Sequence, residues 1–336
     1  MNEASYDLPG AKKVFSRIGW ALCAILTITS ILQALWIYVP SILWGADNWM
    51  SASSWGKWLG SVGPLYGIAI PVGLLILRKL PAQTPEDNKL GTKNFWVLLP
   101  ICFCLMYGGN IIGTLLSFLL SGGTAQNEVL DYIMDDSPLK VLVIVILAPL
   151  LEEFVCRKQI IDRTKQYGEK AAVFLSALTF GLLHQNLFQF FYAFALGLVF
   201  AYLYVRTGRL RYTVVLHCIV NFMGAVVAPW VLSLTDMEAL NSMDPNASVN
   251  EITALYGQIL PGLAVASLYA LCLIALSIIG LVLLIIKGKQ LIWKEAQAQL
   301  PPGTCAKTVY WNAGMALYVL LCIVSIIISL FGGVLL

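Results

Sequence analysis

The chain contains only two histidines, His184 and His217, and each lies in an apolar stretch beside another residue at helical spacing. Upstream, two adjacent carboxylates, Glu152 and Glu153, end a long apolar run and are followed by Arg157. An ionisable group at membrane depth costs on the order of 3 kcal/mol or more, so each of these places is a candidate functional site. Three such places in one chain favour an enzyme.

The two carboxylates are predicted to have different roles. Residues four apart on a helix lie on nearly the same face, whereas adjacent residues diverge by about 100°. Glu153 can therefore pair with Arg157, in the favourable order for an ion pair of this spacing, while Glu152 is free to face a reaction site. A carboxylate in apolar surroundings is suited to accept and return protons near neutral pH. The alternative is that both glutamates are interfacial charges at the end of a span.

Each histidine has a partner one helical turn away. Phe180 precedes His184, and an aromatic ring at this position can fix the imidazole and exclude bulk water. Asn221 follows His217, and two donors aimed at one point suit a developing oxyanion. In the alternative interpretation, each histidine is a core residue that links helices by hydrogen bonds.

The composition predicts that these residues lie in a membrane protein, because 59% of the chain is hydrophobic and only 12% is charged. A membrane span needs about 20 mostly apolar residues. We therefore expect an all-α, polytopic bundle that forms a single membrane domain over residues 1–336. Nine spans are predicted, at about 15–40, 58–77, 95–121, 138–157, 171–188, 189–205, 212–234, 259–286 and 309–334.

The basic residues predict that the N-terminus is cytosolic and the C-terminus lies outside. Lys and Arg concentrate in short cytosolic loops of membrane proteins, and in this topology all of the 21 except Lys57 and Lys140 fall on the cytosolic side. Because topology accounts for the basic residues, the lipid bilayer is an expected partner and nucleic acid is not. The eight cysteines avoid the predicted outer loops, so we expect no disulfide framework.

The depths of the candidate residues do not match in this scheme. At about 1.5 Å per residue, Glu152 and His217 would lie on the order of 10 Å from the cytosolic boundary. His184, in a span that starts at residue 171, would lie about 20 Å from it. The three would meet only if that helix is tilted or begins outside the bilayer.

The order of the motifs resembles a known family. The motifs are Glu152-Glu153-x-x-x-Arg157, Phe180-x-x-x-His184 and His217-x-x-x-Asn221. In this order on successive spans they resemble the CAAX-protease and bacteriocin-processing (CPBP) family of intramembrane endopeptidases, also called the type II CAAX prenyl endopeptidase or Abi family. The stretch from Tyr204 to Leu210 also looks like the family's approach to the third motif. The resemblance covers about residues 138–225, which would form the catalytic core.

The resemblance implies a peptidase in which a glutamate and a histidine activate a water molecule. Carried onto this chain, it makes Glu152 the base and His184 its partner on the water. It makes His217 and Asn221 the oxyanion site, and Glu153 and Arg157 the supporting pair. Such a mechanism has no covalent intermediate.

A metal mechanism is the alternative, because two histidines and a glutamate also match catalytic zinc ligation. In that case Glu152, His184 and His217 would be the ligands. We favour the metal-free form, with no cofactor, because Asn221 suits an oxyanion donor better than a zinc ligand.

These observations predict an integral, multi-pass membrane endopeptidase that cuts a peptide or membrane-associated protein near the cytosolic side. In a bacterium it would lie in the plasma membrane. The first alternative is a non-catalytic scaffold or bacteriocin immunity protein of the same fold. The second is a proton-coupled transporter, which would be expected to show repeated halves that the sequence lacks. The substrate and the oligomeric state do not follow from the sequence.

Overall fold

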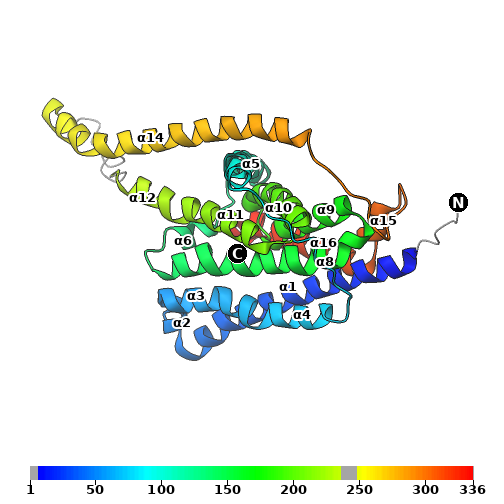
Figure 1. Ribbon diagram of the computed structural model, residues 1–336. Coiled ribbons are helices and arrows are strands. Elements are labelled where there is room, and N and C mark those ends of the chain that lie inside the picture. The colour runs from blue at the N-terminus through cyan, green and yellow to red at the C-terminus, as the bar shows by residue number, and fades with distance from the viewer. Residues whose placement is uncertain (1–6, 236–247, 336) are drawn as a thin grey trace.

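The computed structural model describes residues 7–235 and 248–335 of the chain. Every regular element in these two ranges is a helix, and neither range contains a strand (Figure 1). This confirms the expected all-α class. The chain is an integral, multi-pass membrane protein, because seven of the described helices are long and apolar enough to cross a bilayer.

The seven helices correspond to seven of the predicted spans. They are Leu8–Trp44 (α1), Ser54–Leu77 (α3, Ser54–Val62; η1, Gly63–Ala69; α4, Ile70–Leu77), Thr92–Ser121 (α5), Leu187–Thr207 (α10), Leu210–Ser233 (α11, Leu210–Phe222; η5, Met223–Val227; α12, Ala228–Ser233), Val249–Gly288 (α14) and Ala313–Phe331 (within α16, Ala313–Leu335). Short helices lie in the connections, namely α2 (Trp49–Ala52), α6 (Val129–Ile133) and α15 (Cys305–Val309). The count of nine spans and the orientation stay predictions.

The predicted span at 138–157 is one helical run that continues further than expected. It consists of η2 (Val141–Leu147), α7 (Ala148–Glu153), η3 (Phe154–Gln159) and α8 (Ile160–Thr164). The segments η2 and η3 are π-helical, a wider turn that occurs often at functional sites. The predicted end at residue 157 is therefore wrong by about two turns.

This longer helix removes most of the predicted mismatch in depth. Glu152 lies roughly 18 Å from the end of the helix at Thr164, rather than about 10 Å. The following helix, α9, runs from Glu169 to Leu183, after a short 3₁₀ turn (η4, Lys165–Tyr167). His184 then lies roughly 22 Å from the start of α9. Because the two helices are joined by this short turn, Glu152 and His184 come to similar levels.

The predicted boundary between the spans 171–188 and 189–205 lies a few residues too late. Helix α9 ends at Leu183, and α10 already begins at Leu187. Between them Gln185 has φ 51°, a left-handed conformation that is uncommon outside glycine. The Asn186 side chain caps α10 by accepting a hydrogen bond of 2.8 Å from the Phe188 N–H. This sharp turn places the partly buried His184 just after the last residue of α9.

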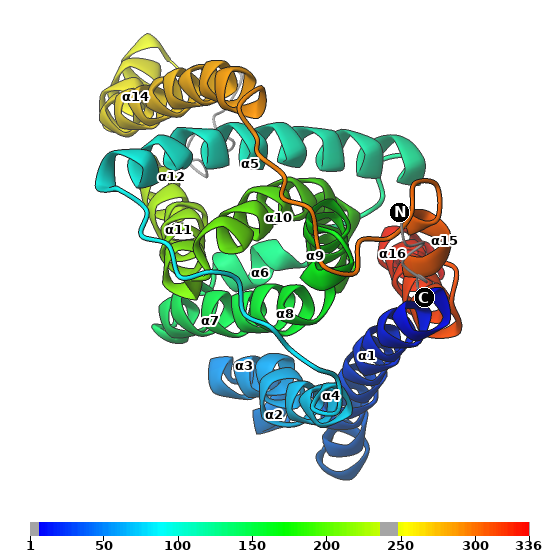
Figure 2. The ribbon, with the colours of Figure 1, turned by 45° about the vertical axis from the view of Figure 1, so that its right-hand side comes forward.

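Small residues let the helices around α10 approach closely. A Cβ at Gly197 of α10 would come within 2.9 Å of the Ala177 backbone on α9. A Cβ at Gly109 of α5 would come within 2.5 Å of the Tyr192 backbone on α10. Close packing of this kind is typical of helix contacts in membranes. Figure 2 shows α10 beside α9 and α11, with α5 between α10 and α14.

Candidate active site

The centre of the site is a fully buried ion pair. Arg157 Nε lies 3.0 Å from Glu153 Oε2, and Arg157 Nη2 donates to Glu153 Oε1 at 3.0 Å. Both side chains have no exposed surface. The guanidinium also donates to Ser176 Oγ at 3.2 Å and lies 4.6 Å from the centre of the Phe180 ring. The predicted pairing of Glu153 with Arg157 is therefore present, and it ties the first motif to α9.

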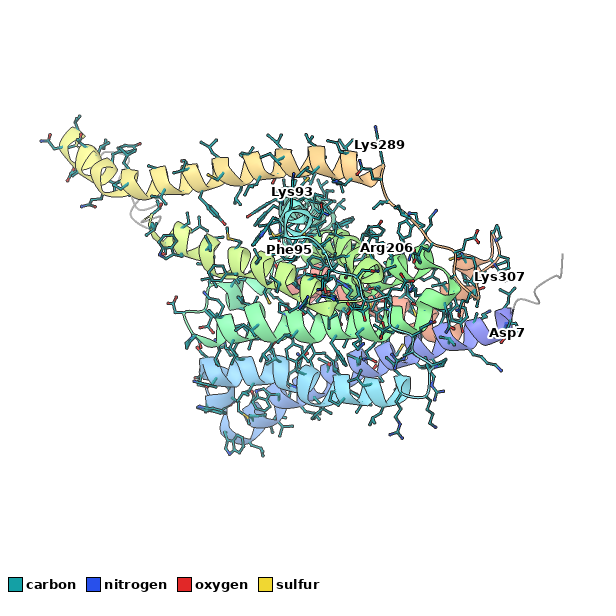
Figure 3. All side chains as sticks on the ribbon, in the orientation of Figure 1. Asp7, Lys93, Phe95, Arg206, Lys289 and Lys307 are labelled. Carbon is teal, nitrogen blue, oxygen red and sulfur yellow. The ribbon has the colours of Figure 1, made fainter. Side chains whose placement is uncertain are left out.

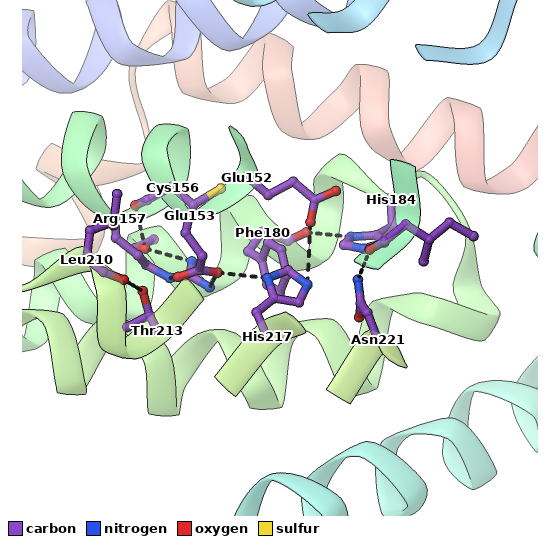
Figure 4. A network of polar contacts seen from close by, with 12 residues as sticks. Glu152, Glu153, Cys156, Arg157, Phe180, His184, Leu210, Thr213, His217 and Asn221 are labelled. Carbon is purple, nitrogen blue, oxygen red and sulfur yellow. Dashed lines mark hydrogen bonds and ion pairs between the residues drawn. The ribbon is translucent and has the colours of Figure 1, made fainter. Parts of the chain in front are cut away.

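His217 lies between the two glutamates (Figure 4). Its Nδ1 is 3.2 Å from Glu153 Oε1, and its Nε2 is 3.8 Å from Glu152 Oε2. Because the Glu153 carboxylate accepts hydrogen bonds, it favours a proton on His217 Nδ1. The ring is 4% exposed and packs against Phe180 and Phe200. Glu153 therefore orients the imidazole. The separation between its Nε2 and Glu152 is too long for a hydrogen bond.

Glu152 and His184 line a common cavity of about 250 Å³. Glu152 Oε2 is buried, and no hydrogen-bond partner for it exists in the part of the chain that the structure describes. His184 Nδ1 lies 2.8 Å from the Phe180 carbonyl oxygen. Since a carbonyl can only accept, the proton is on Nδ1, and Nε2 of the neutral ring is left as an acceptor. The cavity is thus lined by two proton acceptors, a carboxylate oxygen of Glu152 from the first motif and Nε2 of His184 from the second.

The walls of this cavity come from elements in which the sequence showed no motif. Helix α1 contributes Thr29 and Gln33, and the segment from α3 to η1 contributes Ser61 and Tyr66. These polar residues stand inside apolar spans, and this was a signal that sequence reasoning could have used. Gln185, the residue with positive φ, lines the cavity beside His184. Ser176, which holds Arg157, was also missed, because a lone serine in a helix has no distinguishing pattern.

Asn221 takes part in a different contact from the one expected. Its Nδ2 donates to the Ile144 carbonyl oxygen at 2.8 Å. At the end of the π-helical segment η2, the Ala148 N–H reaches back five residues and donates to the Val143 carbonyl. The next donor in that pattern would be residue 149, which is a proline without an N–H. Asn221 therefore satisfies the carbonyl that Pro149 leaves free, and it does not line the cavity.

The three residues named as zinc ligands do not form a metal site as they are arranged. Within residues 7–235 and 248–335, no three or more His, Cys, Asp or Glu side chains are grouped so that they could hold a metal ion. We therefore derive no catalytic step through a metal.

Comparison with known proteins agrees with the motifs. The family model for type II CAAX prenyl endopeptidase Rce1-like proteins matches residues 135–223, a range that includes all six candidate site residues. One relative is "Putative membrane peptidase YdiL" of Bacillus subtilis, and another is "Membrane-embedded CAAX protease MroQ" of Staphylococcus aureus. Over residues 135–223 the chain is therefore similar to the type II CAAX prenyl endopeptidases.

The likeness to these two relatives is partial. The chain is 29% identical to YdiL over 160 residues, which are 45% of this chain and 64% of YdiL. It is 29% identical to MroQ over 190 residues, which are 52% of this chain and 74% of MroQ. The chain thus spans less than two thirds of the length of YdiL. No solved structure matches the chain.

Proposed function

We propose that the chain is an intramembrane endopeptidase of the glutamic CPBP type, which cleaves a peptide or a membrane-associated protein with an activated water molecule. The observation that carries this proposal is the cavity that Glu152 and His184 share. It offers a carboxylate oxygen without a hydrogen-bond partner among the described residues and an imidazole nitrogen that can accept a proton. The names of the relatives, a membrane peptidase and a membrane-embedded CAAX protease, support the same activity.

In the proposed mechanism, a water molecule between Glu152 and His184 loses a proton to the carboxylate as its oxygen attacks the scissile carbonyl. Glu152 then returns that proton to the leaving amine. No serine or cysteine is acylated, so the products form in one hydrolytic sequence. The buried pair of Glu153 and Arg157 orients His217, whose Nε2 lies 3.8 Å from Glu152 Oε2.

We expect cleavage to continue in the presence of a strong chelator. The measurement is proteolysis of a panel of peptide and membrane-protein substrates by the purified chain in lipid nanodiscs, with bound zinc assayed in the same preparation. Because general-base hydrolysis by Glu152 and His184 needs no Lewis acid, activity should persist and zinc should be substoichiometric. Loss of activity that returns only when zinc is added would overturn the metal-free mechanism. Failure of every substrate would instead favour the scaffold.

The oxyanion role of Asn221 is a separate prediction. One of its two amide hydrogens is committed to the Ile144 carbonyl, and we propose that the other stabilises charge that develops in the transition state. Loss of one oxyanion donor usually lowers turnover by about 10²–10³-fold. Asn221→Ala should therefore lower kcat by about that factor, with a smaller effect on KM.

A second substitution separates this role from the structural contact. Pro149→Ala supplies the backbone N–H that η2 lacks, so it can satisfy the Ile144 carbonyl when Asn221 is removed. If Asn221 is an oxyanion donor, the double variant of Asn221→Ala and Pro149→Ala should stay as slow as Asn221→Ala. Recovery of kcat in the double variant would show that Asn221 only ties α11 to η2, and the oxyanion role would be withdrawn.

A further inference from the structure

A second and larger cavity lies on another face of α10. It has a volume of about 700 Å³ and is enclosed by α5, α10, the end of α14 and the segment that follows α14. It shares no lining residue with the cavity of Glu152 and His184. On α10, Phe200 faces His217, whereas Val199 and Tyr202 face the large cavity. The proposed catalytic mechanism makes no use of this space.

The chemistry of the large cavity changes along its length. Its inner part is lined by aliphatic residues of α5 and α10, from Ile101 and Leu105 to Ala195 and Leu198. Its polar lining residues lie where the helices begin or end, and they include Asn94, Arg206, Lys287 and Gln290. The cavity therefore has an apolar interior and a polar mouth.

The length of this cavity fits one leaflet of a bilayer. Its lining extends from Asn94 to Leu105 on α5 and from Ala195 to Arg206 on α10. Each stretch spans roughly 16 Å at the rise of an α-helix. The hydrocarbon half-thickness of a membrane is about 15 Å. The two helix ends meet at the mouth, where the Asn88 N–H donates to the Thr207 carbonyl at 2.9 Å.

The mouth carries positive charge. Lys287 and Arg206 are the cations of the lining, and the described lining contains no aspartate or glutamate. Glu169 forms an ion pair with Arg206 Nη2, so Lys287 provides most of the uncompensated charge. Arg206 Nε is buried and lacks a hydrogen-bond partner within the described residues. Figure 3 shows Arg206 and Lys289, the residue just after the end of α14, toward the same end of the molecule.

The outer wall of the mouth is the segment 292–294, which is held by hydrogen bonds and aromatic packing. The Tyr202 hydroxyl accepts a hydrogen bond of 3.1 Å from the Ile292 N–H, and the Trp293 ring packs on Tyr202 with centroids 5.2 Å apart. The Lys294 N–H donates to Glu169 Oε2 at 2.8 Å. Tyrosine and tryptophan side chains are typical of the level of lipid headgroups. The wall thus belongs to the folded structure and closes one side of the mouth.

We propose that this cavity binds one anionic membrane phospholipid. An acyl chain fills the apolar interior between α5 and α10, and the headgroup phosphate meets Lys287 and the Arg206 side chain at the mouth. Basic pockets between membrane helices bind anionic headgroups in this way. A phospholipid fits better than a peptide, because the interior offers no polar partner for a peptide backbone.

The test is native mass spectrometry of the full chain released from nanodiscs that contain phosphatidylcholine and phosphatidylglycerol. We expect retained phosphatidylglycerol in preference to phosphatidylcholine. A cation near the membrane surface contributes about 1 kcal/mol, so Lys287→Gln should lower this preference about fivefold. Ala195→Phe should fill the interior and lower retention of both lipids at least about tenfold.

Lys289→Gln is the matched control. This lysine lies two residues from Lys287 at the same exposed helix end, but it does not line the cavity. It should leave the lipid preference unchanged. Equal loss in Lys287→Gln and Lys289→Gln would show a general surface charge effect and would overturn the proposal. So would full lipid retention by an Ala195→Phe variant with the melting temperature of the wild type.

Discussion

Glu152→Gln should lower peptide cleavage by about 10²–10⁴-fold, the usual contribution of a general base. The glutamine keeps the volume of the side chain but cannot accept the proton of the attacking water. His184→Ala should produce a loss of similar size, because it removes the second acceptor in the same cavity. If both residues act on one water, the double variant should be scarcely slower than the slower single variant. The measurement is kcat in lipid nanodiscs.

The melting temperature provides the control for this prediction. The Glu152 side chain is 24% exposed and forms no hydrogen bond through its buried oxygen, so Glu152→Gln should leave stability nearly unchanged. Cleavage by the Glu152→Gln variant at close to the wild-type rate would remove the general-base assignment. That result would favour the non-catalytic scaffold that the sequence left open.

Glu153→Gln, in contrast to Glu152→Gln, should cause a large loss of stability. The substitution leaves the buried guanidinium of Arg157 without its counterion and leaves one acceptor oxygen to serve both Arg157 and His217. Removal of one partner from a buried ion pair typically costs about 3–5 kcal/mol. We expect a clearly lower melting temperature than that of the adjacent Glu152→Gln variant.

A double substitution tests the physical reason for this loss. Glu153→Leu with Arg157→Met removes both charges and fills the same volume with apolar atoms. Such replacements are often neutral or stabilising, so the melting temperature should return toward the wild-type value. Cleavage should stay low, because His217 would no longer be oriented. A double variant as unstable as Glu153→Gln would contradict the assignment of the loss to an uncompensated charge.

The membrane class and the pairing of Glu153 with Arg157 could be predicted from the sequence for local reasons. Long apolar runs can satisfy their backbone groups in lipid only as helices. The ion pair depends on a spacing of four residues within one helix, which is visible in the sequence. The three motifs could also be recognised, because each joins two residues one turn apart.

The ends of the helices near the site could not be predicted, because apolarity is a poor guide to them. The run that carries Glu152 continues through the charged residues up to Thr164, since Asp162 and Arg163 are buried there by contacts with other segments. Asp162 accepts a hydrogen bond of 2.9 Å from the Tyr204 hydroxyl on α10. Because these partners are distant in sequence, the sequence does not predict that the helix continues past Arg157.

The sequence by itself determined the membrane bundle and predicted the candidate residues, because these depend on composition and on spacings within single helices. Only the tertiary structure decided which residues share a cavity. It placed Glu152 with His184, put His217 between two glutamates and directed Asn221 to the Ile144 carbonyl. The physical reason is that these positions depend on contacts between helices. The Ile144 carbonyl that Pro149 leaves without a donor, for example, finds its partner only when α11 packs against η2.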